Sequence, residues 1–158
     1  MWQNRLGNLF LTVWMGTHWT AGYVVAPVLF KSLDDRQLAG MLAGQVFNIA
    51  AWVGLVAGLL LLVQVIVQDK VNSFRAWRFW LLSVMFALVA IGAFVVQPQM
   101  AALKAQGIIA GTDAASAFGR MHGISSIMHM VISVSGLILV WLGLHSTQAR
   151  PRSALGTW

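Results

Sequence analysis

Among the side chains within the apolar runs of this sequence, the histidines are best suited to bind a cofactor or a metal ion. His18 lies near the middle of the first apolar run, His129 lies at a similar depth in the last run, and His122 precedes His129 by one heptad. Two imidazoles at matched depth on different helices can ligate haem b through both axial positions, or can hold a transition metal ion. A buried neutral histidine can also be satisfied by a hydroxyl or carbonyl group, so a purely structural role stays open.

Several other polar side chains fall in the outer part of the apolar runs. We expect them to meet in one inward layer organised by His122, with these members: Gln45, Asn48, Gln97, Arg120 and Ser125. Polar groups that converge inside a membrane are costly unless they satisfy one another. The layer is therefore either a ligand site open to the outer face, with His18 and His129 as its deeper extension, or a hydrogen-bonded layer that fixes helix register.

The residue types exclude most other reaction chemistries. The chain has no cysteine, which excludes a thiol nucleophile, a zinc–thiolate site and an iron–sulfur cluster. Its acidic residues are Asp34, Asp35, Asp69 and Asp113. No GxSxG, HExxH, P-loop or GxGxxG pattern occurs. We therefore predict no catalytic residues, and only chemistry carried by a cofactor stays open.

The composition indicates that these residues lie in a membrane. The chain has 158 residues, of which 59% are hydrophobic and 9% are charged, and its mean hydropathy is +0.78. So few charged side chains cannot cover a water-soluble domain. The net charge of +6 does not indicate nucleic-acid binding, because the basic residues are scattered between apolar runs without a stripe of interleaved aromatics. The expected partner is the lipid bilayer.

Four long apolar runs predict four transmembrane helices. The expected helices cover residues 6–30, 38–67, 74–97 and 114–145. Each run is long enough to cross a bilayer and lacks the alternation typical of a strand. Short connections predict an antiparallel four-helix bundle, so the fold class is all-α and residues 1–158 form a single domain. Thr112 or Asp113 can cap the last helix.

The distribution of basic residues predicts the orientation in the membrane. Basic residues in short loops are retained on the cytoplasmic side. One end of the predicted bundle carries Arg5, Lys70, Arg75, Arg78, Arg150 and Arg152. The other end carries Lys31, Arg36, Lys104 and Arg120. We therefore expect both termini in the cytoplasm.

Small residues mark the predicted helix contacts. The second helix carries one stripe of glycines, namely Gly40, Gly44, Gly54 and Gly58, and the fourth helix carries Gly119 and Gly123. Helices in lipid gain by close backbone approach, so these stripes are expected to pack within the bundle. A homodimer seam, or a contact with another subunit of a membrane complex, is the alternative. The opposite side of the fourth helix, which includes Ile132 and Leu139, is expected to face lipid.

Three segments resemble motifs of a known membrane family. They are residues 22–30 (GYVVAPVLF), residues 97–100 (QPQM) and residues 118–125 (FGRMHGIS). In order and spacing they resemble the bacterial relatives of transmembrane protein 205, a family of unknown function. This resemblance implies a four-helix protein of the bacterial inner membrane, with His122 inside a family motif. A more distant similarity to copper-resistance D and HemJ-type membrane proteins implies haem or copper as candidate ligands.

Three classes of function follow from these observations. The first is a bundle that binds haem or a transition metal through inward histidines, and the second is a ligand-free accessory subunit of a membrane complex. The third is a small efflux or transport component, which predicts internal repeats or helices broken near mid-membrane. Transport ranks last because Pro27 and Pro98 lie near predicted helix ends and no convincing repeat is found.

Overall fold

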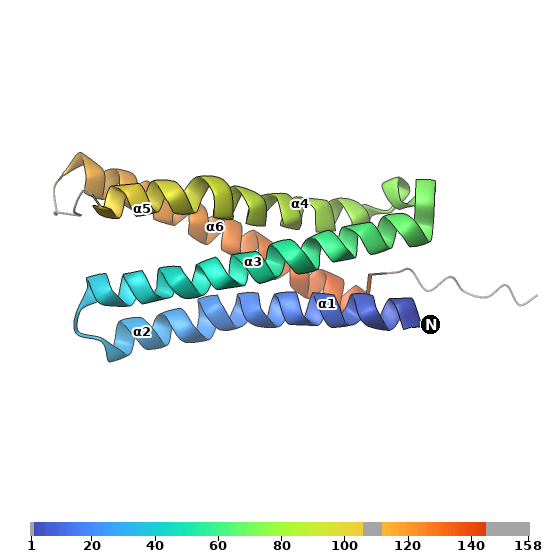
Figure 1. Cartoon of the computed structure of the whole chain (residues 1–158), viewed down its shortest axis with the longest axis horizontal. Coiled ribbons are helices and arrows are strands. Elements are labelled where there is room, and N and C mark those ends of the chain that lie inside the picture. Colours follow the sequence, from blue (N-terminus) through green and yellow to red (C-terminus); the bar gives the residue numbers. More distant parts are fainter. Residues whose placement is uncertain (1, 106–111, 145–158) are drawn as a thin grey trace, which may run out of the picture.

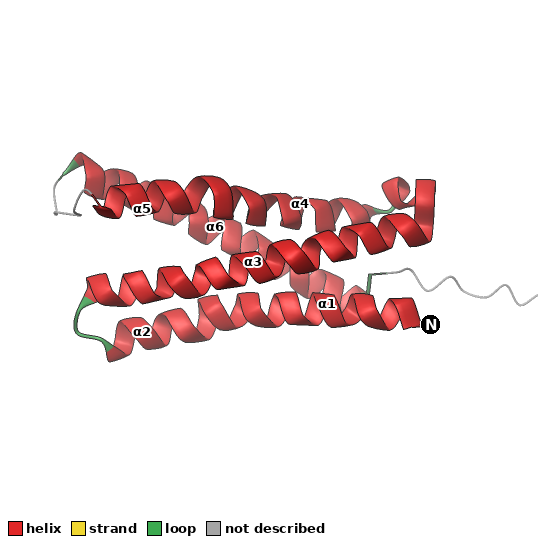
Figure 2. Cartoon of the chain, viewed as in Figure 1, coloured by secondary structure: helices red, strands yellow, loops and turns green. Residues whose placement is uncertain are grey.

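The structure, a computed structural model, describes residues 2–105 and 112–144. Within these ranges it consists of four helical rods, each running opposite to the one before it (Figure 1), and Figure 2 shows no strand among them. The all-α prediction is therefore confirmed. His145, Arg150 and Arg152 lie outside the described residues.

The first and third rods are interrupted helices. The first consists of α1 (Trp2–Trp19), the π-helix η1 (Thr20–Val25) and α2 (Ala26–Ser32). The third consists of α4 (Trp77–Ile91), the π-helix η3 (Gly92–Val96) and α5 (Gln97–Ala105). The third rod thus continues through Pro98 and past its predicted end at residue 97.

The second and fourth rods are continuous helices with clear start signals. The second is α3 (Arg36–Asp69), which is followed by the short 3₁₀ helix η2 (Lys70–Arg75), and the fourth is α6 (Asp113–Leu142). The Asp35 carboxylate accepts hydrogen bonds from two backbone N–H groups in the first turn of α3, at 2.8 and 3.2 Å. The Thr112 hydroxyl accepts one from the first turn of α6 at 3.3 Å, so the predicted cap is confirmed for Thr112.

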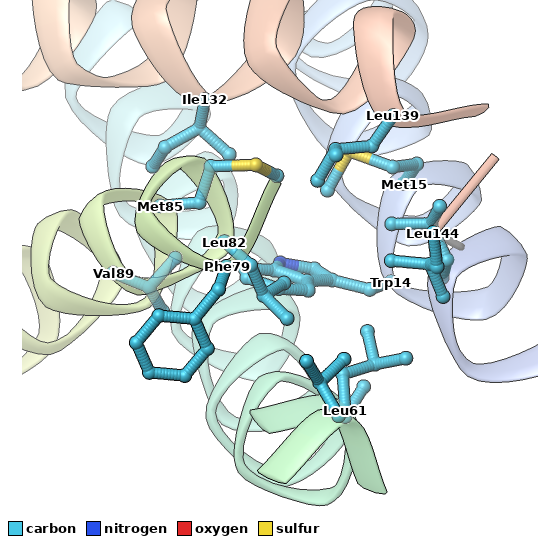
Figure 3. Close-up of a cluster of buried hydrophobic side chains, with 13 residues drawn as sticks. Trp14, Met15, Leu61, Phe79, Leu82, Met85, Val89, Ile132, Leu139 and Leu144 are labelled. Atoms are coloured by element: carbon cyan, nitrogen blue, oxygen red, sulfur yellow. The ribbon is translucent and has the colours of Figure 1, made fainter. Parts of the chain in front are cut away.

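The hydrophobic core fills one half of the bundle, which we call the core half. Figure 3 shows Trp14 among side chains from all four rods. The most deeply buried members of this cluster, each at most 1% exposed, are Trp14, Met15, Leu61, Leu82, Met85 and Leu139. The core half contains the start of α1, η2 and the end of α6. The opposite half, which contains α2, the start of α3, α5 and the start of α6, is called the distal half here.

The fourth rod, α6, crosses the bundle obliquely (Figure 1). It packs on α5 in the distal half and on α1 and α4 in the core half. Ile132 and Leu139 are 3% and 0% exposed, so the prediction that they face lipid is wrong. The reason is that α1 and α4 cover this part of α6 from two directions.

Three of the rods are long and apolar enough to cross a membrane: Arg36–Gln68, Trp77–Ala105 and Asp113–Leu142. Large apolar side chains lie exposed along them, for example Val67 at 65% and Ile127 at 67%. The first rod is not among the three, and its apolar run contains the polar residues Thr17, His18 and Thr20. The described residues therefore have the features of a multi-pass membrane protein.

Candidate functional site

The crossing of α1 and α6 brings His18 and His129 together. Their rings are stacked, with centroids 3.9 Å apart and planes 20° apart. The Nε2 atom of His18 lies 3.2 Å from the backbone carbonyl oxygen of His129. A carbonyl can only accept, so this contact requires that Nε2 of His18 carries the proton. His18 itself is 8% exposed.

Aromatic side chains and a glycine enclose the His129 ring. Tyr23 and Phe47 approach it edge-on, with centroid distances of 5.4 and 5.6 Å. A Cβ added at Gly22 would overlap the His129 ring, so the ring occupies space that only a glycine leaves free. The Tyr23 hydroxyl lies 3.7 Å from the sulfur of Met130 on α6. The histidine pair is therefore held between η1, α3 and α6.

Polar atoms next to the pair are buried without a hydrogen-bond partner among the described residues. They are Nε2 of His129, Oγ of Ser133 and Nε1 of Trp14. Ser133 lies one turn beyond His129 on α6, and Trp14 lies one turn before His18 on α1. Each buried polar group without a partner lowers stability by about 1–3 kcal/mol. The polar atoms around the histidine pair are therefore not explained by packing alone.

Both interrupted rods contain the same kind of break. The N–H of Ala26 bonds the carbonyl of Ala21, and the N–H of Gln97 bonds the carbonyl of Gly92, five residues back in each case. A proline follows directly each time. Its ring conflicts with the preceding turn and it has no N–H, and a widened π turn accommodates both effects.

The two breaks share a short sequence pattern, which the length of the apolar runs does not reveal. Residues 21–27 read AGYVVAP and residues 92–98 read GAFVVQP: two small residues, an aromatic residue, two valines, a variable residue and proline. The repeat is short, and it is visible only when the prolines of alternate helices are compared. It marks the position of η1, which carries the glycine and tyrosine that contact His129.

The geometry of the histidine pair does not fit the predicted cofactors. Axial haem ligands face each other across the macrocycle, and stacked rings 3.9 Å apart leave no space for one between them. A shared metal ion requires lone pairs that converge, whereas the lone pairs here lie in two nearly parallel planes. In the described ranges no group of three or more His, Cys, Asp or Glu side chains could hold a metal ion.

The predicted outer layer is not brought together around His122. Gln45, Asn48, Arg120 and His122 are exposed, and Gln97 and Ser125 are partly exposed. The contact of the His122 ring is with Phe118 of the same helix, at a centroid distance of 6.2 Å. The reason is the oblique path of α6, which lies against α5 at this level and leaves the His122 side of the helix uncovered.

The glycine stripes fall into contacting and open positions. A Cβ added at Gly54 or Gly58 would press on Trp14, at 2.6 and 3.1 Å. Gly40 and Gly44 have only a side-chain tip nearby, at 3.8 Å from the added Cβ. A Cβ added at Gly119 or Gly123 would meet no described atom within 4 Å. The stripe of α3 therefore packs through its core-half glycines, and the α6 glycines lie on an uncovered side.

Comparison with known proteins identifies a family. The family model "Domain of unknown function (DUF4149)" matches residues 9–108. The chain belongs to this family. The match includes His18, η1, η3 and Phe47, and it ends before α6, so it does not include His122 or His129. For this DUF4149 protein, neither the search of curated proteins nor the search of solved structures finds a match.

Proposed function

We propose that this DUF4149 protein is a four-span protein of the bacterial inner membrane with both termini in the cytoplasm. The first rod contacts α3 through both α1 and α2, so a bilayer crossed by α3 is crossed by the first rod as well. Two of its hydroxyl groups are satisfied locally: those of Thr12 and Thr17 donate to backbone carbonyls four residues back, at 2.8 Å each. That pairing lowers the cost of placing the first rod in lipid.

Single-cysteine labelling tests this topology, because the chain has no native cysteine. We expect a membrane-impermeant thiol reagent added outside cells to label Asp34→Cys in the α2–α3 link, and to spare Asn72→Cys in η2 and a cysteine tag at the N-terminus. Labelling of Asn72→Cys instead would reverse the orientation. Labelling of both Asp34→Cys and the tag would mean that the first rod does not cross.

We infer further that the His18–His129 pair is a proton-binding site of a small transport component. The observation that carries this function is the stacked pair itself, enclosed within the bundle where the first and last rods cross. Ionisable groups at such positions are costly, and membrane proteins retain them for proton or ion movement. With Nε2 of His18 donating to a carbonyl, Nδ1 of His18 and Nε2 of His129 are left to accept and release a proton.

The broken helices support transport over the two other classes. Breaks in transmembrane helices concentrate at substrate and ion sites, and π turns occur frequently at functional sites. One break, η1, contains Gly22, which contacts the His129 ring. The other break, η3, lies in the third rod within the same sequence pattern. In a ligand-free accessory subunit the breaks would only accommodate the prolines, and the contact of η1 with His129 would have no role.

Proton flux into vesicles tests the proposal. Purified protein is reconstituted with an internal pH dye, and flux is started by a membrane potential. We expect flux in the wild type and in His122→Gln, which removes an exposed histidine from the same helix, and a loss of about tenfold or more in His18→Gln and His129→Gln. Equal flux in all four proteins, or no flux in the wild type, contradicts the proposal. A Soret band or stoichiometric metal in the purified protein would favour the cofactor class instead.

A further inference from the structure

A second candidate site lies between α5 and α6, away from the histidine pair. A shallow hollow of about 460 Å³, open to the surface, lies between the two helices in the distal half of the bundle. Its lining is mostly apolar, from Ala102, Leu103 and Ile124, and its polar members are Gln99 and Arg120. Small-molecule sites have this size range and this mixture of apolar wall with a few polar groups.

Arg120 is the charged group of this hollow, and its charge is not balanced. Its side chain is exposed, and no hydrogen bond or ion pair of Arg120 is found within the described ranges. Asp113 lies two helical turns away on the same helix. The neighbouring cation Lys104 is already engaged: its ammonium donates to the carbonyl of Gly40 at 3.1 Å and lies 5.5 Å from the Phe118 ring centre. An unpaired guanidinium at the edge of a bilayer attracts an anion.

Arg120 and Gln99 lie near adjacent ends of α6 and α5, where a lipid headgroup would lie if both helices cross the bilayer. Arg120 lies two turns, or about 10 Å, below the start of α6, and Gln99 lies at a similar distance below the end of α5. Ile124 lies one turn deeper than Arg120 and continues the wall with an apolar surface. An amphiphile with its acidic group at Arg120 and its tail along Ile124 fits this order of polar and apolar residues.

We propose that the hollow between α5 and α6 binds an anionic phospholipid, whose phosphate pairs with Arg120 and Gln99 and whose acyl chain lies against the apolar wall. The guanidinium can bond two phosphate oxygens at once, and the glutamine amide can donate to a third. A zwitterionic lipid is less suitable because its ammonium group would lie near a guanidinium that has no acid beside it.

Lipid retention measured by native mass spectrometry tests this site on the full-length protein. The protein is released from micelles that contain phosphatidylglycerol and phosphatidylcholine in equal amounts. We expect the wild type to retain phosphatidylglycerol in preference to phosphatidylcholine. Arg120→Gln should lower that preference about tenfold, the value of one charge-assisted contact. Ala117→Trp, which keeps the charge and fills the hollow, should lower retention of both lipids.

The control separates a defined site from general attraction to a basic protein. Lys31→Gln removes the same charge from the exposed end of α2, away from the hollow, and should leave the preference unchanged. An equal loss in Lys31→Gln and Arg120→Gln would overturn the proposal, since net charge would then explain the binding. Equal retention of the two lipids by the wild type would overturn it as well.

Discussion

Single residues in this bundle are matched by size across helix contacts. Trp14 lies on Gly54 and Gly58, and a Cβ added at Gly136 would overlap Met15. The His129 ring lies on Gly22 in the same way. In each case a large side chain occupies the space that a Cβ on the facing helix would need, which is how helices in lipid gain close packing.

Gly22→Ala tests the contact that holds the histidine pair. The new methyl would overlap the His129 ring, so we expect a loss of about 1–3 kcal/mol in stability and a loss of proton flux as the ring is displaced. Thermal unfolding in detergent and the vesicle assay measure the two effects. Gly119→Ala, at an open position of α6, is the control and should leave both unchanged. Comparable losses in the two variants would show that the His129 contact is not special.

Gly54→Leu and Gly44→Leu test the stripe of α3. At Gly54 the added side chain meets Trp14, which is 1% exposed and cannot move without opening the core, so we expect destabilisation of about 3 kcal/mol or more. At Gly44 the nearest atom is the flexible tip of Lys104, at 3.8 Å, so the change should be small. Equal midpoints of thermal unfolding for the two variants would contradict this assignment.

The sequence predicts the depth of single residues along a helix, but it does not predict which of them a neighbouring helix covers. Glycine spacing places Gly54 and Gly119 on stripes of the same kind, but only the position of a neighbouring helix decides which of them is covered. The matched depth of His18 and His129 could be read from the sequence because each lies at a countable distance along its own apolar run. The exposure of His122 could not, because it depends on the crossing angle of α6.

The length of the apolar runs and a capping residue predict the helices and the start of the last one, whereas they do not predict the breaks. The hydrogen-bonding shift at η1 and η3 adds one residue to a turn without interrupting the apolar run, so a search for apolar length does not detect it. For this reason the sequence predicts a helix end at Pro98, although the third rod continues to Ala105. The prolines and the repeated valine pairs were the available signal.

Lys70 at the end of α3 gives a prediction about a single element. Its backbone has φ 50 and ψ −129, a conformation that favours glycine. Within the described ranges, no other non-glycine residue has a positive φ. Lys70→Gly should therefore raise stability by about 1 kcal/mol in thermal unfolding. Lys70→Ala keeps a Cβ and should give no such gain. A gain of the same size in Lys70→Ala would assign the effect to the lost charge.

The two halves of the molecule differ in which side chains they bury and in how their helices pack. The core half holds the large buried side chains from all four rods, and it fixes the packing of α1, α3, α4 and α6. In the distal half the buried side chains include the small Ala39 and Ala43 of α3 and Met100 of α5, and α6 lies beside α5. The histidine pair lies between the halves, where a stable core meets helices that contain π turns.

The central claim is that His18 and His129 act as one proton-binding unit, and a double-mutant cycle on vesicle proton flux tests it most directly. If the two rings share one function, His18→Gln/His129→Gln should reduce flux no further than either single variant, because the first change already removes the site. The singles should also retain the wild-type midpoint of thermal unfolding to within a few degrees. Losses that multiply in the double variant, or flux in it at the wild-type level, would contradict this claim.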